Sequence, residues 1–124
     1  MEFYIWQRCG NLITCLDNKG VPVMCCGQKM TQLGPGTVDA SREKHVPVVE
    51  TAGSPATVTV GPVEHPTLPE HFIPWIALET NQGSQIKYLQ PGQAPKASFA
   101  LAEGEEVKAV YEYCNLHGLW VASI

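Results

Sequence analysis

Four histidines and one cysteine of this chain together offer enough ligands to bind a metal ion. The 124 residues contain four histidines, and the last of them belongs to the motif Cys114-Asn115-Leu116-His117. The candidate ligands are His45, His65, His71, Cys114 and His117. Neutral imidazole and thiolate both bind transition metals well. We therefore expect the function of the protein to depend on this set.

The number of candidate ligands favours iron over zinc and copper. Structural zinc is normally satisfied by four ligands, so five nitrogen and sulfur ligands exceed what tetrahedral zinc uses. A blue-copper site would add a weak axial methionine, but Met1, Met24 and Met30 all lie near the N-terminus, far from His117 in sequence. Four imidazoles and one thiolate suit a five-coordinate iron with a vacant position. A noncatalytic metal-binding or electron-transfer protein that holds zinc or copper in the same ligands is the alternative.

Composition limits the class of protein. With 44% hydrophobic residues, the chain can bury one sizeable core. A net charge of −4 without a cluster of basic residues argues against nucleic-acid binding. Every apolar run is interrupted well short of the roughly 18 residues that a membrane-spanning helix needs, and Glu2 and Arg8 do not fit a signal peptide. Five cysteines are an odd number, which favours reduced thiols over a disulfide framework. We expect a cytoplasmic protein.

Short runs rich in valine, isoleucine, threonine and aromatic residues predict an all-β protein. Ten prolines and eleven glycines separate these runs. The segments expected to form strands are 46–51, 56–60, 72–80, 85–89, 97–101, 107–113 and 119–123. Seven short strands at this spacing predict an antiparallel β-sandwich, in which loops at one end are neighbours. The five candidate ligands can therefore meet, and Trp75 and Trp120 are expected to pack in the core.

The N-terminal segment, residues 1–36, is expected to be separate from the main domain, residues 37–124. Leu33 to Gly36 has the composition of a linker. Within the segment, residues 11–16 and 21–24 flank the turn 17–20 and predict a small β-hairpin. Residues 37–42 are compatible with a helical turn.

Several short motifs, taken together, resemble those of a known family. They are Glu43-Lys44-His45-Val46-Pro47, His65-Pro66, His71-Phe72, Cys114-Asn115-Leu116-His117-Gly118-Leu119-Trp120, and, near the N-terminus, Cys9-Gly10-Asn11 and Cys25-Cys26-Gly27 followed by Met30. The family is that of the superoxide reductases, also called desulfoferrodoxins and neelaredoxins. The resemblance covers nearly the whole chain.

The resemblance implies an immunoglobulin-like sandwich that holds one mononuclear non-haem iron. Cys114 would be the axial thiolate, and the four equatorial ligands would be His45, His65, His71 and His117. Superoxide would bind at the open sixth position, take one electron and leave as hydrogen peroxide. An axial thiolate pushes electron density onto iron, which favours this transfer.

The resemblance also implies roles for neighbouring groups and partners. Lys44 would attract the anionic substrate and orient a proton-donating water. Glu43 matches a glutamate that can occupy the sixth position of ferric iron in this family. The electron donor would be a small protein such as rubredoxin, and the N-terminal segment would support a homodimer, as in relatives.

The N-terminal segment departs from the family pattern. Two-iron members use four cysteines to hold a rubredoxin-like iron, but Trp6 stands here in the place of the first. The remaining three, Cys9, Cys25 and Cys26, make a poor tetrahedral site. Cys15 lacks the usual spacing to Cys9 and falls at an apolar position of an expected strand. We therefore expect a degenerate desulforedoxin-like segment without its own iron.

Overall fold

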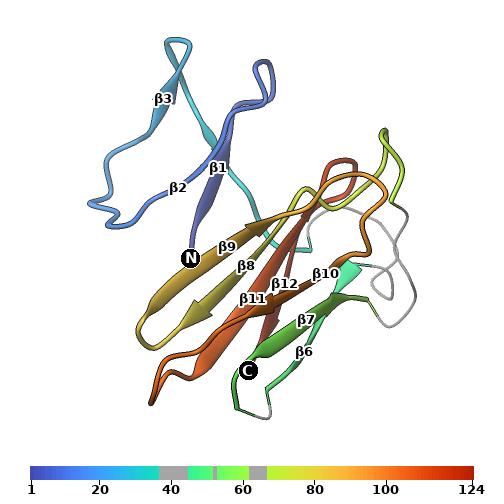
Figure 1. Ribbon diagram of the computed structural model, residues 1–124. Coiled ribbons are helices and arrows are strands. Elements are labelled where there is room, and N and C mark those ends of the chain that lie inside the picture. The colour runs from blue at the N-terminus through green and yellow to red at the C-terminus, as the bar shows by residue number, and fades with distance from the viewer. Residues whose placement is uncertain (37–44, 52, 62–66) are drawn as a thin grey trace. The chain divides into compact units, whose positions relative to one another are not determined.

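The computed structural model describes residues 1–36, 45–51, 53–61 and 67–124 (Figure 1). Three candidate site residues, Glu43, Lys44 and His65, lie outside the described residues, as does the expected helical turn at 37–42. The chain divides into two compact units, Met1–Gly34 and Pro35–Ile124. In the described part of the chain, no helix is both long and apolar enough to cross a membrane.

The second unit is a β-sandwich, which confirms the predicted fold class. Within its described residues, one sheet has the order β10-β7-β6 and the other has the order β12-β11-β8-β9. All neighbouring strands are antiparallel. The strands are β6 (Pro47–Glu50), β7 (Ala56–Val60), β8 (Trp75–Thr80), β9 (Gly83–Tyr88), β10 (Lys96–Phe99), β11 (Val107–Cys114) and β12 (Gly118–Ser123). Each overlaps a strand expected from the sequence.

The core lies between the two sheets and follows the two-residue period of the strands. In β7, Ala56, Val58 and Val60 are fully buried, while the threonines between them are partly or fully exposed. They belong to one apolar cluster with Phe99 of β10 and with residues of the other sheet, including Ile76, Leu78, Val110 and Cys114. Burial of an aliphatic or aromatic side chain of this size contributes about 1.5–3 kcal/mol. The cluster therefore holds the two sheets together and includes one of the candidate metal ligands.

The outer face of the four-stranded sheet is partly covered by its own aromatic side chains. Trp75 and Tyr113 are cross-strand neighbours whose rings stack at 5.7 Å. The hydroxyl of Tyr111 donates a hydrogen bond to Glu79, and Ala77, the partner of Tyr111 in β8, is fully buried. Trp75 therefore packs on the outer face and not in the apolar cluster, contrary to the prediction. Side chains on both faces of β8 are buried, which explains why apolar and polar residues do not alternate regularly along this strand.

The first unit forms a small sheet whose strand pairing differs from the predicted hairpin. Its order is β2-β1-β5, with β1 at Phe3–Ile5, β2 at Leu12–Thr14 and β5 at Thr31–Gln32. A separate hairpin pairs β3 (Met24–Cys25) with β4 (Gln28–Lys29). The expected pairing of 11–16 with 21–24 is wrong. Phe3 and Ile5 are buried and make β1 the central strand, whereas Leu16 and Val21 are 96% and 73% exposed.

Candidate metal centre

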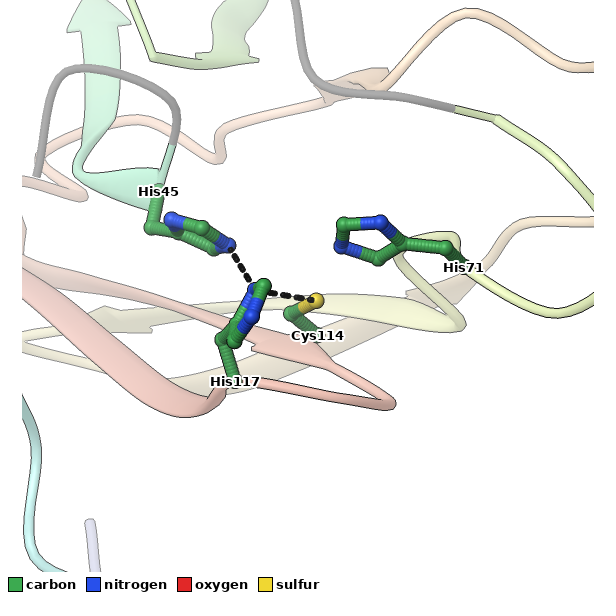
Figure 2. A group of neighbouring side chains, drawn as sticks. All are labelled: His45, His71, Cys114 and His117. Atoms are coloured by element: carbon green, nitrogen blue, oxygen red, sulfur yellow. Dashed lines mark hydrogen bonds between the residues drawn. The ribbon is translucent and has the colours of Figure 1, made fainter. Parts of the chain in front are cut away.

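Four of the five predicted metal ligands converge at one end of the sandwich (Figure 2). One ligand atom from each of His45, His71, Cys114 and His117 lies within 4.8 Å of the others. Nδ1 of His117 is 3.1 Å from Nε2 of His45 and 3.9 Å from Sγ of Cys114. The structure thus brings together side chains that are far apart in sequence.

A tight turn between β11 and β12 positions Cys114 and His117. β11 ends at Cys114, β12 begins at Gly118, and these two residues are opposite each other in the antiparallel ladder. Gly118 has φ of +79°, a conformation that glycine adopts without strain and that closes three-residue hairpin loops. Nε1 of Trp120 donates a hydrogen bond of 3.1 Å to the carbonyl of His117. The turn and this bond fix the backbone of the Cys-x-x-His motif.

Asn115 ties this turn to the segment that carries His71. Its Nδ2 donates to the carbonyl of Glu70 at 3.0 Å, and its Oδ1 accepts from the backbone N–H of Phe72 at 3.0 Å. Its own backbone N–H donates to the carbonyl of Phe72 at 3.2 Å. Two backbone hydrogen bonds between Leu68 and His71 close the same segment on itself. Asn115, which lies between Cys114 and His117 in the sequence, therefore also positions the segment of His71.

The two-sheet packing brings His45 to the other ligands. His45 lies two residues before β6, is 2% exposed, and stacks on the indole of Trp120 with ring centroids 5.1 Å apart. Its ring meets that of His117 edge-on at 4.9 Å, and the ring of His71 meets His117 in the same way at 5.0 Å. One indole thus packs against His45 and binds the carbonyl of His117. As predicted, Trp120 is buried.

Burial controls the charge of the Cys114 sulfur. Cys114 is fully buried, and burial raises the pKa of its thiol, while backbone hydrogen bonds from Leu116 and His117 partly oppose this change. A thiolate ligand must be deprotonated, so metal binding has to release this proton. The positive charge of a metal ion would provide the compensation that the apolar surroundings lack.

Glu112 is a buried carboxyl next to the site that the sequence analysis did not single out. It is fully buried, and neither oxygen has a hydrogen-bond partner among the described residues. Burial raises its pKa well above the ordinary value, which favours the protonated, uncharged carboxyl. It lies on the same face of β11 as Cys114 and opposite Trp120 in the ladder. The alternation of Val110, Glu112 and Cys114 in the sequence was the available signal for an inward-facing acid.

The arrangement fits a transition-metal ion. The His45 and His117 nitrogens are 3.1 Å apart, close enough for both to bind one ion at the usual metal–nitrogen distance of about 2.0–2.1 Å. The Cys114 sulfur lies farther from His117, at 3.9 Å, and belongs to the same cluster of possible ligand atoms. Imidazole together with thiolate is a donor set that iron accepts.

A second group of possible ligands lies in the first unit. It consists of Cys9, Cys25 and Cys26, whose sulfur atoms are within 4.8 Å of one another. Cys15 is half-buried and is not part of this group. Three thiols do not fit a rubredoxin-like iron, which takes four.

A family model, related sequences and solved structures all match this chain to one family. A family model described as desulfoferrodoxin matches residues 37–123. A desulfoferrodoxin from Syntrophotalea carbinolica is 44% identical over 120 residues, covering 97% of this chain and 94% of the relative. The crystal structure of the superoxide reductase from Treponema pallidum matches with a TM-score of 0.82 at 40% identity over 98% of both chains. A one-iron superoxide reductase from Giardia intestinalis matches 66% of this chain and 97% of its own, with a TM-score of 0.57 at 33% identity. The chain therefore belongs to the desulfoferrodoxin family of superoxide reductases.

Proposed function

We propose that this protein is a superoxide reductase, an antioxidant oxidoreductase that converts superoxide into hydrogen peroxide. The observation that carries the proposal is the convergence of three imidazoles and one buried thiol within 4.8 Å. Relatives that cover nearly the whole chain belong to the same family. The alternative, a noncatalytic zinc or copper protein, is not favoured, since matching structures are named superoxide reductases.

We propose one iron per chain, bound in the second unit. His45, His65, His71 and His117 would bind this iron through imidazole nitrogens, and Cys114 would bind it through its thiolate. Bound iron would supply the single electron that reduces superoxide. The Cys114 thiolate would give electron density to the metal, and its burial would keep water away from the sulfur.

The two residues before His45 are proposed to act at the position where superoxide binds. We propose that Lys44 attracts superoxide through its positive charge and orients a water that donates a proton to the product. Glu43 is proposed to offer its carboxylate as a further ligand, which would bind when the iron is oxidised. Trp120, packed on His45, excludes water from one side of the ligand set.

Optical spectroscopy and metal analysis test the proposal. Ferric iron with an axial thiolate absorbs visible light, and zinc does not. We expect oxidised protein to be coloured and to reduce superoxide without releasing oxygen, and we expect Cys114→Ser to lose both the colour and the activity. Cys15→Ser, at a half-buried cysteine outside both ligand groups, is the matched control and should retain both. A colourless oxidised protein with one zinc per chain would disprove the proposal.

We further propose that the first unit lacks a rubredoxin-like iron and that the protein receives electrons from a small donor such as rubredoxin. Anaerobically purified protein should contain about one iron per chain and not two. All five cysteines, which lie in the described residues, are free thiols, and this state suits the reducing cytoplasm where we place the protein. We also propose a homodimer, which light scattering can test.

A further inference from the structure

Three thiols of the first unit form a cluster that the proposed reaction does not use. Sγ of Cys9 is 3.5 Å from Sγ of Cys25, which is 3.8 Å from Sγ of Cys26. Trp6 replaces the cysteine that would complete a four-thiolate site, so the three thiols do not fit the iron that relatives of the two-iron kind hold. Their spacing and environment instead suit chemistry between the sulfur atoms themselves.

Two turns bring the thiols together. Cys9 lies in the turn between β1 and β2, which is closed by hydrogen bonds from Gly10 N to Trp6 O at 2.8 Å and from Trp6 N to Asn11 O at 3.0 Å. Cys25 ends β3, and the two-residue turn that follows has positive φ at Cys26 (+53°) and Gly27 (+74°). Such turns favour asparagine and glycine, and a cysteine there costs backbone strain. The strained turn keeps the thiols of the second hairpin beside Cys9.

Cys9 has the properties of a nucleophile. Its side chain is exposed, and the backbone N–H of Asn11 donates to its sulfur at 3.5 Å, which lowers the pKa of the Cys9 thiol. The thiolate is the reactive form of cysteine. An open depression of about 260 Å³ beside it is lined by Trp6, Arg8, Cys9, Cys26 and Gln28. A small uncharged oxidant can therefore reach the sulfur.

Cys25 has the properties of a resolving thiol. Its hydrogen bond with Cys9, at 3.5 Å between the sulfur atoms, raises the pKa of Cys25 and so favours Cys25 as the partner that keeps its proton. Nδ2 of Asn11 donates to the Cys25 sulfur at 3.6 Å. The same residue thus contacts both sulfurs and holds them side by side. A low-pKa, accessible cysteine next to a second thiol is the usual environment of a peroxide-oxidised cysteine.

We propose that Cys9 reacts with hydrogen peroxide and that Cys25 then closes a disulfide with it. The Cys9 thiolate attacks one peroxide oxygen, an S–O bond forms, the O–O bond breaks, and the leaving hydroxide takes a proton to become water. Cys25 then attacks the Cys9 sulfur, an S–S bond forms, and the hydroxyl of the sulfenic acid leaves as a second water. Two thiols lose two electrons and one peroxide gains them. Hydrogen peroxide is also the product of the proposed reductase reaction. Only this origin of the peroxide depends on the proposed function, and the reaction of the thiols does not.

The test adds hydrogen peroxide directly to the full-length, metal-containing protein, after reduction with dithiothreitol and its anaerobic removal. One equivalent should remove two free thiols, and peptide mapping should show Cys9 linked to Cys25. Dithiothreitol should restore both thiols. Cys25→Ser should stop at a Cys9 sulfenic acid that dimedone labels, and Cys9→Ser should slow thiol loss by about tenfold or more. Cys15→Ser is the matched control and should behave like the unsubstituted protein.

Three outcomes would overturn the proposal. They are the absence of a Cys9–Cys25 link in the unsubstituted protein, an unchanged rate in Cys9→Ser, and protection of the thiols by a bound metal that a chelator removes. The mapping of the unsubstituted protein does not depend on the folding of any variant. Because peroxide is added, a disulfide without superoxide reduction would disprove only the proposed function. Superoxide reduction without a disulfide would disprove only the role of the thiols.

Discussion

Nε2 of His45 lies 3.1 Å from Nδ1 of His117, although one residue precedes β6 and the other lies between β11 and β12, in the opposite sheet. At this distance the two ring nitrogens share one hydrogen when no metal is bound. Binding of one metal ion by both nitrogens would require the donating imidazole to carry its hydrogen on its other ring nitrogen, and it would displace the proton of the Cys114 thiol. Metal binding is therefore expected to release protons and to weaken in acid.

Replacing Asn115 with alanine should weaken metal binding more than it weakens the fold. The substitution removes the two side-chain hydrogen bonds to residues 70 and 72, and so loosens the segment that holds His71. We expect metal affinity to fall by about 10- to 100-fold and stability to fall by about 1 kcal/mol. Competition with a chelator and urea unfolding measure the two effects.

Asn81 provides a matched control for Asn115. Its side chain makes the same two kinds of hydrogen bond, to Gly104 O at 3.1 Å and from Glu106 N at 2.8 Å, near the opposite ends of β8 and β11. Asn81→Ala should cost a similar amount of stability and leave metal affinity unchanged. Equal metal loss in the two variants would show that Asn115 acts only through general stability.

Trp120→Phe separates the two roles of the indole. The phenyl ring can still pack on His45, but the hydrogen bond from Nε1 to the His117 carbonyl is lost. We expect about 1–2 kcal/mol of destabilisation, since a partly buried carbonyl loses its donor, and about tenfold weaker metal binding. Trp75→Phe, on the outer face of the same sheet, should not change metal affinity. Metal binding that is unchanged in Trp120→Phe would restrict the indole to packing.

Lys44→Ala should slow the reaction with superoxide. Electrostatic attraction raises association rates and is screened by salt, so the variant should also depend less on ionic strength. Pulse radiolysis or stopped-flow kinetics at several salt concentrations measure both effects. Lys87→Ala, an exposed lysine of β9, is the charge-matched control. Identical salt dependence in the two variants would remove the steering role from Lys44.

Glu105→Gln should reduce stability at neutral pH but not in acid. The Thr80 hydroxyl and the Ala102 N–H donate to the Glu105 carboxylate at 2.6 and 2.9 Å, and these bonds lower its pKa. A lowered pKa means that the carboxylate stabilises the fold above its unfolded pKa, and that this contribution is lost as the pH falls through the folded pKa. Unfolding at about pH 7 and about pH 3 should show the difference from the unsubstituted protein shrinking. Glu103→Gln, at an exposed neighbouring carboxylate, should show little difference at either pH.

The sandwich was predictable because its strands follow simple patterns. β7 alternates buried aliphatic residues with threonines, and its predicted bounds match the structure. The approach of four candidate ligands was also predictable, since Cys114 and His117 fall at a turn between two strands, where loops of a sandwich are neighbours. Glu112 was not, because a single acid in a strand normally faces solvent. Only its position between Val110 and Cys114 places it inside.

The first unit was less predictable because its strands are short. A local turn signal at residues 17–20 favoured pairing of the segments on either side, but the apolar alternation of Phe3 and Ile5 determines the sheet. The pairing of β1 with β5 joins residues far apart in sequence, which no local signal announces.

The candidate ligands lie on both sheets of the sandwich, and this affects how the protein unfolds. His45 is attached to the sheet that contains β6, whereas Cys114 and His117 are attached to the sheet that contains β11 and β12. An ion bound by all three would link the two sheets, and it would stay bound only while the sheets are packed together. Binding to the folded state alone adds about 2.7 kcal/mol when free metal is 100 times its dissociation constant. During slow denaturation, the visible absorption of the thiolate-bound iron should therefore be lost before the β-structure. This absorption would report the first separation of the two sheets.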